Sequence, residues 1–283
     1  MSLETRRFDS VGAFLDVCGS FLEAREPEHQ LTLGIVGDAE AHGGFPEDGA
    51  LVAALRDGRV TATAIWTPPW NVILSEVDDE QAVPAIADSL AAEDLGGVNG
   101  PAEHVEAFAR AWCERAGRRY VEAMRQRSYA IDAVTSPRDV PGRLRRAGPG
   151  DRAVMTVWMD GFDREAMGSE AGRRDIDAMV DELINSSSRI GYIWEDGGPV
   201  SMLQATGATP HGIRIGAVYT PPELRRHGYA SALVAAASQA ELDRGRRWCF
   251  LFTDLANPTS NRIYQAIGYR PIRDVHMLRF DRP

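Results

Sequence analysis

The sequence contains no lysine, so each of its 31 basic side chains is an arginine. Aspartate and glutamate number 41, which gives a formal net charge of −10 at pH 7. We attribute the missing lysine to genomic base composition rather than to function. The shortage of positive charge argues against a general nucleic-acid binder, because phosphate contacts need a basic surface. A cationic amine substrate is compatible with it, although net charge speaks mainly to solubility.

Long apolar runs, paired cysteines and metal-ligand spacings are missing as well. No window approaches the roughly 18 apolar residues of a membrane span, so none is predicted. The opening MSLETRRFDS lacks the apolar core of a secretory signal, and a cytoplasmic protein is expected. Three widely spaced cysteines, Cys18, Cys113 and Cys249, predict no disulfide framework. The six histidines show no ligand spacing and CxxC does not occur, which predicts no metal site.

What remains is the composition of a globular protein, with 44% hydrophobic and 25% charged residues. The 283 residues suffice for two domains. Residues 135–151, TSPRDVPGRLRRAGPGD, hold three prolines and three glycines. They predict an extended connection with a short strand from Gly142 to Arg146. We therefore predict two domains, 1–134 and 135–283.

The C-terminal half alternates helical and extended patterns. Two helices, at 153–162 and 174–187, precede three strands and an Ala-rich helix that Gly245 stops. An apolar strand, the helix NPTSNRIYQAIG and a last strand then close the chain. The predicted strands lie at 189–196, 199–209, 213–220, 248–255 and 271–280.

The N-terminal half repeats this order in outline. Helices are predicted at 11–23, 29–36 and 79–94, and strands at 50–56, 59–66, 71–77 and 127–134. Because only the order of elements repeats, we interpret this half as a diverged copy of the same module. The predicted fold class is α/β (α+β), with tandem, mostly antiparallel mixed sheets flanked by helices.

The segment after the strand at 213–220 has the composition of a phosphate-binding loop. Pro221 and Pro222 end the strand, because neither can donate a ladder hydrogen bond. Gly228 then stands where the chain turns into a helix, and small Ala230 keeps the helix start open. Backbone N–H groups of the loop and of the first helical turn lack internal partners and can bind phosphate oxygens. Taken alone, R-x-x-G-x-A also fits a surface turn that begins an ordinary helix.

The order of strand, Pro-Pro, RRHGYA, Ala-rich helix, apolar strand and NPTSNRIYQAIGY resembles the GNAT superfamily of N-acetyltransferases. The residues from Gly198 to Arg279 therefore resemble an acetyl-CoA-binding domain. EPEHQLTLGI and VNGPAEHVEAFARAW further resemble a bacterial group of two-domain GNAT proteins. The pyrophosphate loop that this resemblance implies comprises Arg225, Arg226, His227, Gly228, Tyr229 and Ala230.

The resemblance also implies how acetyl-CoA, the co-substrate, is bound. The strands at 213–220 and 248–255 are expected to splay and open a V-shaped cleft. Backbone groups of Val218 and Thr220 would pair there with the pantetheine amides, and the amine would arrive from the other side.

Tyr264 occupies the family's general-acid position. A phenol with a pKa near 10 can donate a proton to a departing thiolate, since the pKa of a free thiol is about 8.5. The alternative role of Tyr264 is packing on the buried side of its helix, beside Ile263 and Ile267. Asn257 and Asn261 match cofactor-contacting positions, although each also suits a helix cap or a turn.

The general base has no candidate at the family's usual position. Many relatives carry a glutamate near the place of Arg214, and arginine cannot act as a base at ordinary pH. A water relay to Glu195 or Asp196 would replace it, or the amine arrives neutral. Arg214 also suits binding of a carboxylate on the acceptor, or a solvent-facing strand position.

The N-terminal half lacks the phosphate loop. TPPWNVILSEVDDEQAVPAI contains no Arg/Gln-x-x-Gly-x-Gly/Ala pattern, and Asp78, Asp79 and Glu80 stand where a phosphate would approach. We predict that this half does not bind acetyl-CoA in the usual way. It would form a wall of the acceptor cleft or support the other half. Its aromatic run from Trp66 to Trp70 suits a pocket lining or packing between strands.

Three functional hypotheses follow. The first is an acetyltransferase acting on a primary amine of a small molecule, as a monomer or homodimer that binds neither nucleic acid nor membrane. The second is a tandem enzyme resembling mycothiol synthase, which acetylates a cysteinyl amino-sugar conjugate. The third is a non-catalytic acyl-CoA sensor or interaction protein. Gly228 and Tyr264 argue against the third hypothesis, whereas Arg214 favours it.

Overall fold

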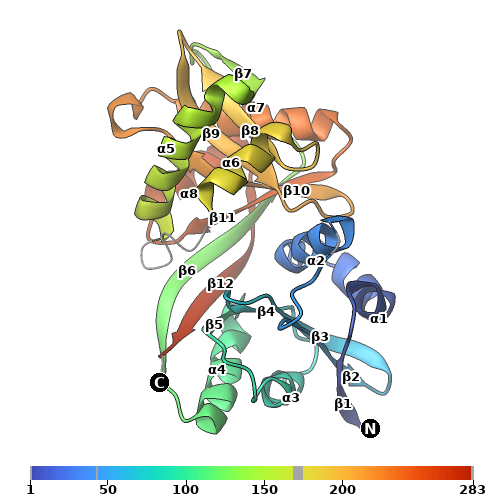
Figure 1. Ribbon diagram of the computed structural model, residues 1–283. Coiled ribbons are helices and arrows are strands. Elements are labelled where there is room, and N and C mark those ends of the chain that lie inside the picture. Colours follow the sequence, from blue (N-terminus) through green and yellow to red (C-terminus); the bar gives the residue numbers. More distant parts are fainter. Residues whose placement is uncertain (1, 43, 168–174, 282–283) are drawn as a thin grey trace. The chain divides into compact units, whose positions relative to one another are not determined.

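The computed structural model describes residues 2–42, 44–167 and 175–281. Within them the chain forms two compact units, each with strands and helices of its own (Figure 1). Unit 1 comprises the residues up to Tyr129, Phe252–Asn257 and the residues from Pro271 onward, and unit 2 comprises Ala130–Leu251 and Pro258–Arg270. The domain boundary at residue 134 stays a prediction.

The sheet of unit 2 has the strand order β7-β8-β9-β10-β11. Neighbours from β7 to β10 are antiparallel, whereas β10 and β11 are parallel and are connected by a helix, α7. The strands are β7 (Arg143–Arg146), β8 (Ile190–Glu195), β9 (Pro199–Thr206), β10 (Gly212–Tyr219) and β11 (Trp248–Asp254), and the helices are α5 (Arg152–Phe162), α6 (Ile176–Asn185), α7 (Tyr229–Asp243) and α8 (Pro258–Ile267).

These elements confirm the secondary structure predicted for the C-terminal half. Strand β9 ends at Thr206, earlier than predicted, and Gly207 follows with a left-handed φ of 61° that does not continue a strand. Arg174, where the second helix was predicted to begin, lies outside the described residues.

Helices cover both faces of this sheet. Successive strand residues point to opposite faces. Ile193 of β8 belongs to one apolar cluster with Met155 of α5 and Leu183 of α6, whereas the Tyr192 hydroxyl donates to Glu241 of α7 at 2.6 Å. Helices α5 and α6 therefore lie on one face and α7 lies on the other (Figure 1).

The sheet of unit 1 has the order β1-β2-β3-β4-β5-β12-β6. Here β4 and β5 are the parallel pair, connected by α3, and Val275–Arg279 of the last strand pairs antiparallel with Gly97–Pro101. The strands are β1 (Leu3–Arg7), β2 (Ala50–Arg56), β3 (Arg59–Trp66), β4 (Val72–Leu74), β5 (Gly97–Pro101), β6 (Tyr120–Ile131) and β12 (Arg270–Phe280), and the helices are α1 (Val11–Glu23), α2 (Gln30–His42), α3 (Ala82–Ser89) and α4 (Ala102–Ala116).

The two units share one order of elements. An edge strand, two helices, three strands, a helix, a parallel strand and a helix follow one another in both, from β1 to α4 and from β7 to α8. This agreement confirms the predicted tandem fold.

Several bounds in the N-terminal half differ from the prediction. β1 was missed because LETRR is polar and mostly exposed, and β5 was missed because GVNGP carries two glycines and a proline. Strand β4 is shorter than predicted, helix α2 continues to His42 and β6 begins at Tyr120. Polar exposed strand residues give no periodic signal, which explains the late start predicted for β6.

Candidate active site

The chain turns sharply between β10 and α7. Arg226 and Gly228 both have left-handed φ angles, 68° and 83°, and Gly228 is the residue that precedes the first turn of α7. A Cβ added at Gly228 would lie 2.9 Å from Val140 Cγ2, so the site requires glycine for its space as well as for its φ. Val140 had not been singled out from the sequence, because it lies far away in the chain.

The start of α7 leaves backbone donors available. The first N–H groups of a helix have no partner within it, and Gly228 offers no side chain to cap them. In the part of the chain that the structure describes, no carbonyl or side chain accepts from the N–H groups of Tyr229, Ala230 or Ser231. The positive end of the helix dipole adds to them. This arrangement is suited to binding an anion such as a phosphate.

Side chains of the predicted loop take different roles. Arg225 donates through Nε to the Thr220 carbonyl at 2.8 Å and through Nη2 to both Glu165 oxygens at 2.8 and 2.7 Å. Exposed Arg226 has no carboxylate partner among the described residues. Glu165, which the sequence pattern did not single out, belongs to a π-helical turn that extends α5.

Two further loop side chains fix the helix start. His227 and Tyr229 stack with ring centroids 5.5 Å apart, and His227 Nδ1 lies 3.2 Å from the Leu224 carbonyl oxygen. The Tyr229 hydroxyl donates to Asp196 at 2.7 Å, which raises the pKa of Tyr229. The neighbouring helix position, Ala230, is half-buried and adds no bulk.

Strand β10 is distorted next to this loop. Its pairing with β9 shifts by one residue between Gly216 and Tyr219, and Ala217 in the bulge has a positive φ of 46°. For alanine such a backbone costs roughly 1–2 kcal/mol, so surrounding structure must hold it. Within unit 2 the ladder between β10 and β11 joins only Gly212–Arg214 to Trp248–Phe250. The bulge takes Val218 out of register with β9.

Polar groups at the C-terminal end of β10 already make hydrogen bonds within the protein. The Ser201 hydroxyl lies 2.9 Å from the Tyr219 carbonyl oxygen and 2.8 Å from Thr220 Oγ1. The Thr220 carbonyl already accepts from Arg225, which leaves one of its two lone pairs for a ligand amide.

Tyr264 lies on α8. Its ring meets that of Tyr269 edge-on at 6.0 Å, and the Tyr269 hydroxyl bonds to Ser238 of α7 at 2.8 Å. Among the described residues no partner is found for the Tyr264 hydroxyl. Burial raises the pKa of Tyr264 to about 12, so this phenol stays protonated throughout the physiological pH range.

The two predicted asparagines precede and follow the start of the same helix. Exposed Asn257 lies in the turn after β11 and its N–H donates to the Asp254 carbonyl at 3.0 Å. Half-buried Asn261 lies within α8. Their contact with a cofactor stays a prediction.

Arg214 lies in the middle of unit 2. It pairs with Thr206 in β9 and with Phe250 in β11, and its guanidinium lies against Gly207. Cross-strand partners share a face, so Arg214 lies on the same face as its partner Thr206 and, further along β9, as Gln204 and Met202. Met202 belongs to the apolar cluster with residues of α5 and α6. Arg214 therefore lies on the face that α5 and α6 cover.

Glu195 is already committed to two arginines. It accepts from Arg143 Nη2 at 2.7 Å and from Arg145 Nε at 2.8 Å, and Arg145 also pairs with Asp151 at 2.6 Å. The Arg143 and Arg145 guanidiniums hold the pKa of Glu195 below its usual range. A carboxylate in this environment is a poor proton acceptor, and Asp196 is occupied by Tyr229.

Cys18, Cys113 and Cys249 are buried free thiols. Among the residues described, no three His, Cys, Asp or Glu side chains come together as a metal site. None of the helices described is long and apolar enough to cross a membrane.

Comparison with known proteins adds to this geometry. Residues 196–278 match the model of the family described as FR47-like protein. No curated protein sequence is similar enough to this chain to count as a relative.

Solved structures share the fold along the whole chain. A GCN5-related N-acetyltransferase from Sphaerobacter thermophilus is 19% identical with a TM-score of 0.57, over 99% of this chain and 96% of that one. A Drosophila protein is 13% identical with a TM-score of 0.68, over 98% of both chains. A tandem GNAT protein from the clavulanic acid biosynthesis pathway is 13% identical with a TM-score of 0.54, over 99% and 98%.

Proposed function

We propose that this chain is an acetyl-CoA-dependent N-acetyltransferase of the GNAT superfamily that acts on a primary amine of a small molecule. The observation that carries the proposal is the start of α7. Its open N–H groups, left-handed Gly228 and exposed Arg226 stand between the first strand and the helix of a parallel strand–helix–strand unit. That combination is what a pyrophosphate needs.

The residues present fit the cofactor. The N–H groups of Tyr229, Ala230 and Ser231 would hold the pyrophosphate, and Arg226 would add charge. The Thr220 N–H and the Val218 backbone, freed by the bulge, would hold the pantetheine arm. When bound, acetyl-CoA supplies the thioester carbonyl that the amine attacks.

Tyr264 is the residue that we assign to the leaving group. The new N–C bond forms as the C–S bond breaks, and negative charge passes to the sulfur. With a pKa of about 12, Tyr264 cannot fully protonate a thiolate, since the pKa of a free thiol is about 8.5. Its hydroxyl would therefore stabilise the departing sulfur by a hydrogen bond, and the final proton would come from solvent or from the amine.

The proton on the incoming amine is left to solvent. Arg214 cannot accept it, and both carboxylates considered from the sequence are engaged, Glu195 by two arginines and Asp196 by Tyr229. We therefore propose that the acceptor amine enters neutral or loses its proton to water.

This lack of a base favours one alternative. An acyl-CoA sensor or interaction protein would keep the loop at Gly228 and need no base. A mycothiol-synthase-like acetyltransfer to a cysteinyl amino sugar is a further candidate among acceptors, and an acceptor panel tests it directly.

The test is release of CoA from acetyl-CoA in the presence of a broad panel of small amines that includes a cysteinyl amino sugar. For the best acceptor, Tyr264→Phe should lower kcat about 10- to 100-fold with little change in the KM for acetyl-CoA, since one hydrogen bond to a charged group is lost. The matched control is Tyr269→Phe, which removes a neighbouring hydroxyl bonded to Ser238 and should leave kcat nearly unchanged.

The pH dependence sharpens the assignment. Because the neutral phenol is the active form and its pKa is about 12, kcat should show no alkaline fall due to Tyr264 below about pH 10. If acetyl-CoA binds but no amine raises CoA release, the sensor replaces the enzyme. If Tyr264→Phe retains full kcat, Tyr264 is a packing residue.

A further inference from the structure

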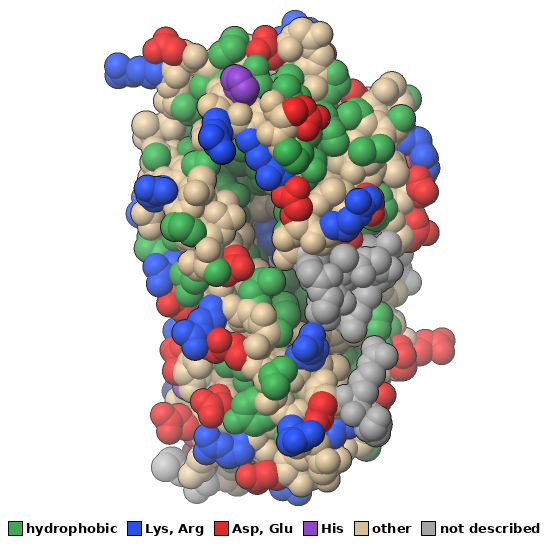
Figure 2. Space-filling model, turned by 90° about the vertical axis from the view of Figure 1, so that its left-hand side faces the viewer, with side chains coloured by type: hydrophobic (Ala, Val, Ile, Leu, Met, Phe, Trp, Pro, Cys, Tyr) green, Lys and Arg blue, Asp and Glu red, His purple; other side chains and the backbone are tan. Residues whose placement is uncertain are grey.

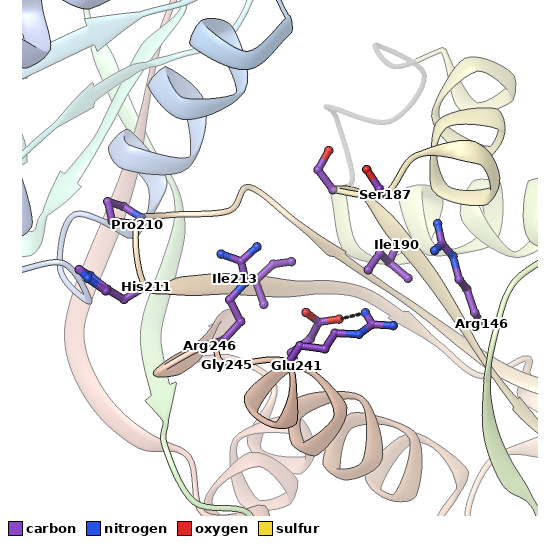
Figure 3. Close-up of a pocket in the computed structure, with 11 residues that line it drawn as sticks. Arg146, Ser187, Ile190, Pro210, His211, Ile213, Glu241, Gly245 and Arg246 are labelled. Atoms are coloured by element: carbon purple, nitrogen blue, oxygen red, sulfur yellow. Dashed lines mark hydrogen bonds and ion pairs between the residues drawn. The ribbon is translucent and has the colours of Figure 1, made fainter.

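A polar hollow lies in unit 2, at the opposite end of β10 and α7 from the loop at Gly228. Its volume is about 330 Å³, and it is lined by the ends of β7, β8 and α7 and by the loop before β10 (Figure 3). The basic side chains of its lining are those of Arg146, Arg244, Arg246 and His211. Figure 3 shows Arg146 and Arg246 on opposite sides, with Glu241 between them.

The charge of this hollow differs from that of the rest of the surface. Most described arginines are paired with carboxylates, and Figure 2 shows acidic and basic side chains interspersed over one face. In the part of the chain that the structure describes, neither Arg146 nor Arg246 has a carboxylate partner. Two such arginines have thus gathered in one hollow of a protein whose net charge is −10.

The acidic residue of the lining is neutralised internally. Glu241 is 2% exposed, and its Oε1 accepts from the Tyr192 hydroxyl at 2.6 Å and from Arg244 at 2.7 Å. Counting three arginines against one glutamate leaves a surplus of two positive charges. The C-terminal end of α7 opposes this with a partial charge of only about half a unit.

Donors remain available in the hollow. A guanidinium has five N–H groups. Arg146 donates one of them to the Ser186 carbonyl, and Arg246 makes one long contact of 3.5 Å with the Thr209 carbonyl. The Ser187 hydroxyl is exposed at the rim, and buried Ile190 and Ile213 form an apolar floor.

We propose that this hollow binds a small organic phosphate monoester, whose dianionic phosphate accepts from Arg146 and Arg246 at the hollow's surface and whose organic part faces Ile190 and Ile213. Guanidinium groups from different elements suit a tetrahedral oxyanion with several acceptor oxygens. The site is separate from the cofactor loop, because α7, with 15 residues, sets the two about 22 Å apart. It does not depend on the proposed acetyltransfer.

The experiment measures phosphate binding by titration calorimetry at constant ionic strength near pH 7.5. Inorganic phosphate and phenyl phosphate are the probes, and benzoate is the carboxylate comparison. The protein carries Gly228→Asp, which closes the cofactor loop, so the binding measured belongs elsewhere. Arg146→Ala with Arg246→Ala should weaken phosphate binding by about tenfold or more. The control, Arg6→Ala with Arg59→Ala, removes the same charge from exposed positions of unit 1 and should change it little.

Phenyl phosphate is expected to bind more tightly than inorganic phosphate, because its ring covers the apolar floor. Absence of saturable phosphate binding to the Gly228→Asp protein overturns the proposal. Equal loss in the control pair, or benzoate binding as tightly as phenyl phosphate, overturns it as well.

Discussion

The helix starts after β10 and after β4 occupy the same place in two copies of one module, but only the first is open. After β10, the N–H groups at the start of α7 meet no acceptor among the described residues. After β4, the chain binds itself: Gln81 N–H donates to the Asp79 carboxylate at 3.0 Å, Ala82 N–H to the Asp79 carbonyl at 2.9 Å, and Asp78 N–H to the Thr61 carbonyl at 2.8 Å.

The C-terminal ends of β10 and β4 also differ in whether their polar groups have partners within the protein. At the end of β10 a bulge frees the backbone near Val218. Beyond β4, the Glu76 N–H donates to His29 Nε2 at 3.2 Å and the Glu76 carboxylate pairs with Arg273 at 2.5 Å. Burial raises the pKa of Glu76 to about 7 in spite of that arginine. One module leaves backbone N–H groups open at its helix start, whereas the other satisfies them with its own carbonyls and side chains.

The largest effect is expected at Gly228. Gly228→Asp should weaken acetyl-CoA binding at least about 100-fold, because it puts a carboxylate and a strained φ at the proposed phosphate site. Gly58→Asp is the matched control, since Gly58 also has a left-handed φ, 78°, but lies in a hairpin of unit 1 with open space around it. Calorimetric titration with acetyl-CoA measures the affinity of both variants. Equal affinities would show that the loop at Gly228 does not bind acetyl-CoA.

A smaller effect separates the two loop arginines. Arg226→Ala should raise the KM for acetyl-CoA about three- to fivefold and weaken its dependence on salt, because an exposed charge near the proposed phosphate site is lost. Arg225→Ala should act mainly on thermal stability, because Arg225 is held by Glu165 and Thr220. Steady-state kinetics at two salt concentrations measure the KM for acetyl-CoA of both variants, and thermal melting measures their stability. A larger KM change for Arg225→Ala would reverse the assignment.

The smallest effect on binding is expected in unit 1. Asp79→Ala removes the carboxylate that holds Arg56 and the Gln81 N–H, and should lower the Tm. The affinity and stoichiometry of acetyl-CoA should stay unchanged, because the loop still lacks a glycine and keeps Asp78 and Glu80. Thermal melting and an acetyl-CoA titration check both parts. Appearance of a second acetyl-CoA site in this variant would show that Asp79 alone closes the loop.

Periodicity and turn residues predicted most of unit 2. The run IRIGAVYT, the proline pair and the Ala-rich helix each carry a local signal, and β10 and α7 follow them closely. The tandem order was also foreseen, although β1 and β5 were not, because a polar edge strand and a five-residue strand with two glycines carry no periodic signal.

Contacts between distant segments could not be predicted. Val140 against Gly228, Glu165 on Arg225 and Asp196 on Tyr229 join residues far apart in the chain, and no local pattern encodes them. The same applies to Glu195, whose two arginines disqualify it as a base only once β7 and β8 are paired. The pairing of β12 with β5 likewise depends on topology rather than on local sequence.

The stoichiometry of acetyl-CoA binding tests the central comparison most directly. Isothermal titration of the 283-residue chain should give one acetyl-CoA per chain, because the loop at Gly228 is open and the loop at Asp79 is closed. Two sites per chain, or none, would contradict the account.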